Sequence, residues 1–417
     1  MVSCYGNIQL LKDRGLSMTT YNFDKITNRK GTNCLKYDFA VERGKPADVL
    51  PLWVADMDFP VSEEITKSLH AAVEHGIYGY TQPKDAYYNA VMNWMERNHN
   101  WKTEREWIVK TPGVVFALGA AVKAFTDPGD AILIQNPVYY PFTNIIRDND
   151  RRVVDNTLIY EKTAGQSGDN GYRIDFEDFE RKLEQEHIKL FILCNPHNPV
   201  GRVWTVEELQ KLGEICLRHH VTVVSDEIHN DFVYPGYEHT VFANVDPRFA
   251  EFTLTCTAPS KTFNLAGLQI SNIFIPNENL RKAFKTEIDR TGYDEPNALG
   301  VVACEAAYRA GEDWLDQLRA YLLKNLNFLR DFLQEKLPQI HLVEPEGTYL
   351  VWLDCSELGI TGKELDQFIV DKAGLWLDGG SMFGPSGAAF QRVNIACPRA
   401  TLELALNKLK AAVDNLK

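Results

Sequence analysis

One lysine, Lys261, stands where the chain could place a reactive amine. An alternating apolar run at residues 252–256 has strand character and ends at Ala258-Pro259, directly before a Ser-Lys pair. α/β proteins bind ligands at the carboxyl ends of buried strands. A lysine held there loses hydration and can give up its charge, which makes it a usable nucleophile for Schiff-base chemistry. The alternative is a solvated lysine at a loop edge, since most lysines are exposed.

An acid and an amide follow other predicted strands in the same manner. Asp226 ends a valine-rich strand, and a carboxylate so near a buried strand needs a cation or a hydrogen-bond donor. Asn198 lies between prolines in the segment 194–201, where proline stops the strand and restrains the residue before it. The structural alternatives are an N-cap or salt bridge for Asp226 and an ordinary polar turn for Asn198.

Two further segments could hold a flat, anionic ligand. Gly113 follows a strand and opens an apolar helix, so the backbone N–H groups of Gly113, Val114 and Val115 suit a phosphate, although a full glycine fingerprint is lacking. Tyr139 and Tyr140 come just after another strand. One ring could stack on a flat ligand, but tyrosines in such positions more often pack in the core.

These features share one location, the carboxyl ends of successive predicted strands. A phosphate seat, an aromatic ring, an amide, a buried acid and a lysine together match one ligand, pyridoxal phosphate. The lysine would form the Schiff base, and the acid would keep the pyridine nitrogen protonated so that the ring accepts the electrons of a carbanion. The charged ring should in turn hold Asp226 ionised.

The elements that must position these residues follow a regular order. Short apolar strands alternate with helices from Trp107 onwards, which indicates a parallel sheet with crossover helices. A Thr-Val-Glu-Glu capping box at Thr205 predicts the start of one of these helices. The predicted strands are residues 107–110, 131–135, 189–193, 221–225, 252–257 and 271–275, and the other predicted helices span 61–75, 86–98 and 313–336.

Chain length and pattern predict an α/β protein with two domains. At 417 residues the chain is long enough for a large domain with a companion. We expect an extension and arm at 1–62 that packs with the small domain, a large cofactor-binding domain at 63–305, and a smaller α+β domain at 306–417. The small domain should contain strands near 348–353 and 391–395 and a last helix from Leu402. Met18 is a candidate for the true start of the protein.

Composition excludes several classes of function. A net charge of −13 argues against nucleic-acid binding, which needs a basic surface. No uninterrupted apolar stretch of about 18 residues predicts a spanning helix, so no membrane partner is expected. The 8 cysteines are scattered without a C-x-x-C pair, which indicates neither a zinc site nor a disulfide framework. Free thiols favour a reducing, cytoplasmic location.

Five segments together resemble the MalY/PatB group of cystathionine β-lyases, within the aminotransferase class I/II superfamily. They are WVADMDFP, YGYT, CNPHNPVGR, SDEIHNDFV and APSKTFNLAGLQ, and the match runs from about Tyr21 to the C-terminus. The resemblance implies the fold-type I architecture of pyridoxal-phosphate transferases, with a mainly parallel sheet in the large domain. It also implies a pyridoxal 5'-phosphate cofactor and a homodimer with shared active sites.

The resemblance assigns roles to individual residues. Lys261 would carry the cofactor and move the Cα proton of the substrate. Arg392 would bind the substrate α-carboxylate in the bidentate manner that guanidinium suits, with Arg399 as the competing candidate. Tyr80 would reach the phosphate of the neighbouring subunit and assist catalysis. The remaining expected contacts are Gly113, Val114, Val115, Tyr139, Asn198, Asp226, His229 and Ser260 for the cofactor, and Tyr140 and Asp56 for the substrate.

Two positions depart from the broad aminotransferase pattern. Gln269 stands where many aminotransferases have a phosphate-binding arginine, and His229 stands where many have a tyrosine. Both agree with the lyase group. His229 could contact the 3-oxygen of the cofactor or merely pack. The expected reaction is α,β-elimination from a sulfur amino acid, giving a thiol, pyruvate and ammonia. An aminotransferase on the same scaffold and a cofactor-bearing regulatory protein are the alternatives.

Overall fold

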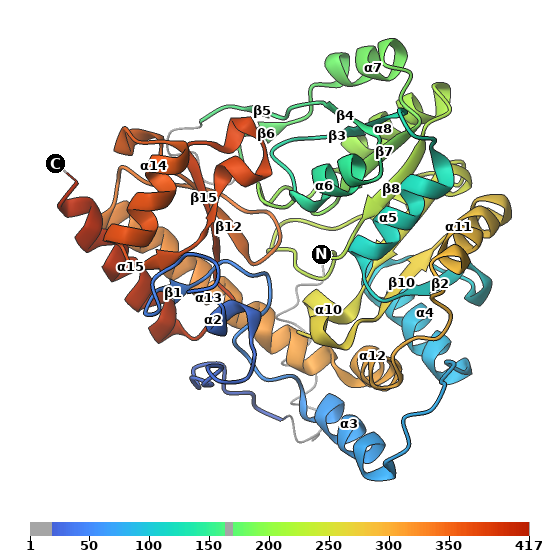
Figure 1. Cartoon of the computed structure of the whole chain (residues 1–417), viewed down its shortest axis with the longest axis horizontal. Coiled ribbons are helices and arrows are strands. Elements are labelled where there is room, and N and C mark those ends of the chain that lie inside the picture. The colour runs from blue at the N-terminus through green and yellow to red at the C-terminus, as the bar shows by residue number, and fades with distance from the viewer. Residues whose placement is uncertain (1–18, 163–169, 417) are drawn as a thin grey trace.

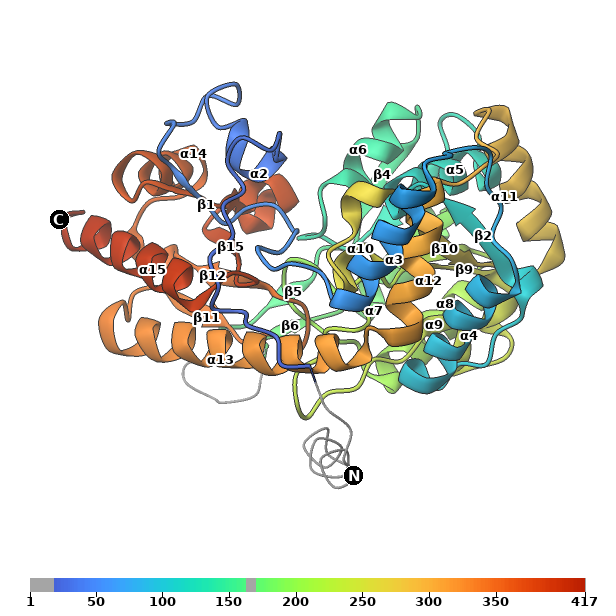
Figure 2. The same cartoon turned by 90° about the horizontal axis from the view of Figure 1, so that it is seen from below.

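The computed structural model describes residues 19–162 and 170–416. The candidate start at Met18 lies outside the described residues. Figure 1 shows a region built on a large sheet and a second region at the C-terminal end of the chain. The long helix α13 (Glu312–Lys336) runs along both regions in Figure 2. In the described residues, no helix is both long and apolar enough to cross a membrane.

The large sheet has seven strands in the order β2-β10-β9-β8-β7-β3-β4. The pairs from β9 to β4 are parallel, whereas β10 is antiparallel to both of its neighbours, β9 and β2. The strands that the sequence predicts here all form, with bounds shifted by one residue at most. They are β2 (Ile108–Thr111), β3 (Ala131–Ile134), β7 (Leu190–Cys194), β8 (Thr222–Asp226), β9 (Thr253–Thr257) and β10 (Ser271–Phe274).

Two features of this sheet were not predicted. The edge strand β4 (Arg152–Asp155) is absent from the expected strands, because its half-exposed sequence RVVD lacks the continuous apolar run of a buried strand. The antiparallel direction of β10 was also not predicted, because a pattern of alternating strands and helices does not reveal it. The connection from α10 (Pro259–Thr262) to β10 has only eight residues, 263–270, and includes the short turn η3 (Ala266–Leu268). It is too short for a crossover helix, so the chain reverses instead.

Helices cover both faces of the sheet (Figure 1). On one face α5 (Val114–Phe125), α6 (Pro141–Asp148) and α11 (Glu278–Arg290) share a core with the strands. On the other, α7 (Phe176–Gln185), α8 (Val206–Arg218) and α9 (Phe242–Val245) do so. The predicted capping box is confirmed: the Glu208 N–H donates to Thr205 Oγ1 and the Thr205 N–H donates to Glu208 Oε2. A third group packs together, namely α3 (Glu63–His75), α4 (Asp85–His99) and α12 (Ala298–Ala310).

The C-terminal region contains a four-stranded antiparallel sheet in the order β11-β12-β15-β14. In this register Arg392 lies opposite Trp352 on one side and Asp378 on the other. The last helix begins at Arg399, earlier than the predicted Leu402. The elements are β11 (His341–Val343), β12 (Leu350–Asp354), α14 (Gly362–Gln367), β14 (Asp378–Gly379), β15 (Phe390–Asn394) and α15 (Arg399–Asp414).

The N-terminal arm lies against this C-terminal region. Strand β1 (Leu50–Pro51) pairs in parallel with β13 (Leu375–Trp376), and a short helix, α2 (Leu35–Asp38), interrupts the predicted extended arm. The Tyr21 N–H donates to Gln317 on α13. These contacts hold the N-terminal arm against the C-terminal region, while the predicted domain boundaries remain a prediction.

Candidate active site

Lys261 lies on the short helix α10, directly after β9. Pro259 opens this helix, because its fixed φ and missing N–H suit the first helical position. The amine of Lys261 is half-buried, and its Nζ donates to the backbone oxygen of Ala55 at 3.0 Å. Burial, and secondarily the positive charge of Arg392, lower the pKa of Lys261 to about 8. A substantial fraction of the amine is therefore neutral near physiological pH.

Asp226 ends β8 and lies opposite Cys194 of β7 and Cys256 of β9. Its carboxylate is buried, and within the part of the chain that the structure describes it accepts one hydrogen bond, from the Ile228 N–H at 3.2 Å. No cation of the described residues forms a salt bridge with it. Burial raises the pKa of Asp226 to about 7, since one backbone donor does not replace the lost hydration. The site thus contains a buried acid that has no salt bridge to a cation among the described residues.

Asn198, from the middle of the chain, and Arg392, from its C-terminal region, meet. The Arg392 Nη1 donates to Asn198 Oδ1 at 3.0 Å, and its Nη2 donates to the Trp53 backbone oxygen at 3.0 Å. The same guanidinium forms a buried ion pair with Asp378. Its Nε is buried and has no hydrogen-bond acceptor among the described residues. Arg399 instead donates to Asn325 on α13 at 2.9 Å. Of the two candidate arginines, Arg392 reaches the other site residues.

The loop 53–59 joins these groups, and sequence reasoning identified only part of its role. The Ala55 oxygen accepts from Lys261 and also from the Tyr349 hydroxyl at 2.9 Å. Asp56, an expected substrate contact, pairs with Arg29 and lies 3.6 Å from Lys36, so its carboxylate is held by the arm. A sequence carries no signal for backbone contacts of this kind. The only feature that could have pointed to this loop is the pair of aspartates in its ADMD segment.

The N-terminus of α5 has the features of an anion-binding site. Gly113 is its N-cap, and a Cβ added there would meet nothing within 4 Å, so the backbone is open to a ligand. Val114 is buried, whereas Val115 is 44% exposed. Ser260, on α10, is half-buried. First-turn N–H groups without intrahelical partners and the positive end of the helix dipole favour an anion at this point.

Two aromatic side chains lie after β3, at the start of α6. The rings of Tyr139 and Tyr140 are 5.5 Å apart between centroids, and both residues are half-buried. Burial raises the pKa of the Tyr139 hydroxyl, and the neighbouring Tyr140 adds to this. Both hydroxyls therefore stay protonated, which leaves Tyr139 available as a flat apolar surface.

His229 is buried next to these groups. Burial lowers the pKa of its imidazole well below the ordinary value, and the charges of Lys261 and Arg392 lower it further. Its ring packs edge-on against Tyr349, with centroids 5.8 Å apart. Its Nδ1 makes no hydrogen bond to any described residue. A neutral imidazole with an unpaired nitrogen is compatible with both roles expected from the sequence.

Tyr80 does not join the other site residues within one chain. It lies on the segment 76–84 between α3 and α4 and is 96% exposed. The neighbouring Ile77 and Tyr78 are also exposed, at 72% and 59%. The expected contact of Tyr80 with a cofactor phosphate would have to be made to another copy of the chain.

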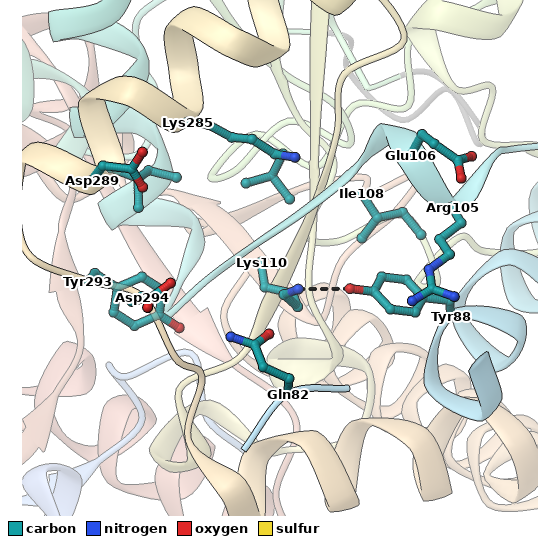
Figure 3. A pocket seen from close by; sticks show the side chains of 12 residues that line it. Gln82, Tyr88, Arg105, Glu106, Ile108, Lys110, Lys285, Asp289, Tyr293 and Asp294 are labelled. Carbon is teal, nitrogen blue, oxygen red and sulfur yellow. Dashed lines mark hydrogen bonds between the residues drawn. The ribbon is translucent and has the colours of Figure 1, made fainter. Parts of the chain in front are cut away.

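A cavity lies elsewhere, beside the edge strand β2. It has a volume of about 380 Å³, and Figure 3 shows its polar lining, including the hydrogen bond of 2.8 Å from Lys110 Nζ to the Tyr88 hydroxyl. None of the expected site residues lines it. This cavity is therefore separate from the expected chemistry.

The residues and the fold agree with one protein family. The family model described as aminotransferase class I and II matches residues 47–409. The chain belongs to this family. Its seven-stranded sheet, with Lys261 and Asp226 at the carboxyl ends of strands, is therefore the shared scaffold of a family, and the expected fold class is confirmed.

Individual relatives are similar over nearly the whole chain. Cystathionine β-lyase PatB of Bacillus subtilis is 47% identical over 392 residues, which cover 94% of this chain and 100% of PatB. Protein MalY of Escherichia coli is 33% identical over 92% of this chain and 96% of its own. Cystalysin from Treponema denticola, a structure containing a pyridoxal 5'-phosphate cofactor, superposes with a TM-score of 0.91 at 38% identity, covering 96% of this chain and 100% of cystalysin.

Proposed function

We propose that this protein is a pyridoxal-phosphate-dependent C–S lyase. It would cleave the Cβ–S bond of cystathionine or a cysteine S-conjugate and give a thiol, pyruvate and ammonia. One observation carries the proposal: the same site contains Lys261, whose pKa is lowered to about 8, and Asp226, a buried acid without a salt bridge to any cation of the described residues. The similarity to PatB and MalY supports the choice of reaction.

The residues present fit this cofactor. A protonated pyridine nitrogen would supply the cation that Asp226 lacks, and the open N-terminus of α5 would receive the phosphate. Asn198 and the unpaired nitrogen of His229 would lie toward the 3-oxygen, and Tyr139 would stack on the ring. When bound, the cofactor supplies an electron sink for the carbanion at the substrate Cα.

The chain itself would bind the substrate and move the proton. Arg392 would hold the α-carboxylate, and Asn198 fixes the direction of its guanidinium. Lys261 Nζ would take the Cα proton, because an amine with a pKa of about 8 is a suitable general base near neutral pH. The loop carbonyl of Ala55, which accepts from Lys261, would keep this amine aimed into the site.

The active unit in this proposal is a homodimer. Tyr80 and its apolar neighbours on the segment 76–84 are exposed in one chain, which is costly for apolar side chains unless a partner covers them. Tyr80 would then contact the phosphate held by the partner subunit. We place the enzyme in the cytoplasm, because the seven cysteines of the described residues are all free thiols.

Pyruvate release tests the proposal directly. Purified, cofactor-loaded protein should release pyruvate and homocysteine in equal amounts from L-cystathionine without any keto acid. Lys261→Ala should abolish this turnover, whereas the exposed Lys372→Ala should not change it. Amino-group transfer that requires 2-oxoglutarate, without pyruvate, would assign the chain to the aminotransferases instead. Retained pyruvate formation by Lys261→Ala would remove Lys261 from the mechanism, and silence in both assays would favour a regulatory protein.

A further inference from the structure

A second, smaller cavity adjoins the arginine expected to bind the substrate. It has a volume of about 220 Å³ and is lined by residues that include Trp53 and Asp378. Both residues also contact Arg392: the backbone oxygen of Trp53 accepts from its guanidinium, and Asp378 forms an ion pair with it. The cavity and the α-carboxylate site therefore share a wall.

Two cations from the arm, Arg43 and Lys45, line this cavity and form no salt bridge within the described residues. Arg43 is exposed and Lys45 is half-buried, and neither forms a salt bridge with any carboxylate of the described residues. The Arg43 guanidinium lies over the Trp53 ring, 5.3 Å from its centroid. Unpaired cations beside a concave surface can bind a carboxylate with charge-assisted hydrogen bonds.

The rest of the lining is apolar and acidic. Trp53 and Trp376 stack with centroids 4.3 Å apart, and Met382 is 46% exposed. One carboxylate oxygen of Asp366 accepts a hydrogen bond from Gln391 at 2.8 Å. Its second oxygen accepts none from the described residues, so it could accept one from a ligand. Cations, a carboxylate and an apolar floor together complement a short hydrocarbon chain that ends in a zwitterionic amino acid.

Tyr140, an expected substrate contact, lies close to charged residues that line the cavity. Tyr140 is half-buried, and the charges of Asp378, Arg392 and Arg43 all act on its hydroxyl, whose pKa is raised first by burial. Tyr140 therefore lies among groups of both the α-carboxylate site and the cavity. A substrate held by Arg392 would have one neighbour of the cavity, Asp378, directly beside its carboxylate.

We infer that this cavity is a subsite for the distal amino-acid group of a long thioether substrate. Arg43 and Lys45 would bind the distal carboxylate, Asp366 the distal ammonium, and the tryptophan pair the methylene groups. A volume of about 220 Å³ corresponds to roughly seven water molecules, which matches the size of the group beyond the sulfur of cystathionine. Substrates without such a group would leave the subsite to water. The inference rests on the proposed function, because it takes Arg392 as the α-carboxylate site.

The experiment compares two substrates that differ in the distal group. The double variant Arg43→Gln/Lys45→Gln should raise KM for L-cystathionine about tenfold, the effect of losing one charge-assisted interaction at a partly exposed site. KM for S-ethyl-L-cysteine, which lacks a distal charge, should change less than twofold. The exposed Lys363→Gln, on α14, should leave both values unchanged. Equal losses for both substrates, or none for cystathionine, would overturn the subsite.

A binding measurement separates this test from the proposed function. Calorimetry with the cofactor-loaded Lys261→Ala variant does not depend on turnover. Its affinity for L-cystathionine should fall about tenfold when Arg43 and Lys45 are also replaced, while its affinity for S-ethyl-L-cysteine stays constant. If the wild-type protein released no pyruvate, the proposed reaction would fail, yet this selective loss of affinity would still support the subsite. An unselective or absent loss would refute it.

Discussion

Asp226 ends β8, Asp231 follows it in the same segment, and the two are similarly buried, with 5% and 3% of their surfaces exposed. Asp226 has one backbone donor, and burial raises its pKa to about 7. Asp231 accepts from Trp94 Nε1 at 3.1 Å, His99 Nε2 at 3.0 Å and Thr262 Oγ1 at 2.6 Å. Burial raises its pKa too, but the hydrogen bond from His99 and the other donors outweigh this, and the net pKa is lowered.

The comparison shows how buried acids can be told apart. The protein itself supplies every partner of Asp231, so this residue stabilises the fold. Asp226 is left for a ligand to complete, and such incomplete solvation marks a binding site. The two are also connected in space, because Thr262, which donates to Asp231, directly follows Lys261. Asp231 thus fixes the helix α10 that carries the expected nucleophile.

The largest expected effect is the loss of Asp231. Asp231→Ala should lower the free energy of unfolding by about 3–5 kcal/mol, because it leaves His99, Trp94 and Thr262 buried without their shared acceptor. Urea unfolding of the cofactor-free protein measures this. Asp371→Ala, at an exposed position, should stay within about 0.5 kcal/mol of the wild type. A loss below about 1 kcal/mol for Asp231→Ala would mean that the two acids do not differ as described.

Asp226→Asn should give effects of opposite sign without and with the cofactor. In the cofactor-free protein, a pKa of about 7 for Asp226 means that the folded state binds more protons than the unfolded state between about pH 4 and pH 7. Wild-type stability should therefore fall as pH rises through this window. Asn cannot ionise, so the variant should be more stable than the wild type at pH 8, by roughly 1–3 kcal/mol.

With the cofactor bound, the same substitution should be harmful. Asn offers no charge to a pyridinium, so kcat should fall about 10²–10³-fold, as it does when one electrostatic partner of a reaction is removed. Unfolding curves at pH 4, 6 and 8 and turnover of the loaded enzyme check the two halves. A cofactor-free variant that is less stable than the wild type at pH 8 would show that Asp226 supports the fold as Asp231 does.

The smallest expected effect concerns the contact between Asp231 and α10. Thr262→Val should cost about 1–2 kcal/mol of unfolding free energy, because it removes one hydrogen bond and keeps the shape of the side chain. Thr262→Ser should recover most of this loss, since serine retains the hydroxyl. Thermal unfolding of both variants is the measurement. If serine and valine behave alike, the hydroxyl of Thr262 contributes nothing to the placement of α10.

The sequence predicted the local chemistry of each strand end. Alternating apolar residues predicted β8 and β9 to within one residue. Their positions also predicted that Asp226, at the end of β8, and Lys261, shortly after β9, lie at the carboxyl ends of strands. The capping box at Thr205 was equally predictable. These features depend on the order of neighbouring residues, because hydrophobic periodicity and backbone capping are local interactions.

The tertiary structure decided which distant groups meet. Nothing in the sequence indicates that the Ala55 oxygen accepts from Lys261, or that Asp378 pairs with Arg392 beside Trp53. It also decided that Asp226 has a single backbone donor while Asp231 has several side-chain donors, although both are aspartates of one segment. The physical reason is that solvation of a buried charge is set by donors from other elements, and only the folded chain brings those donors within hydrogen-bond distance.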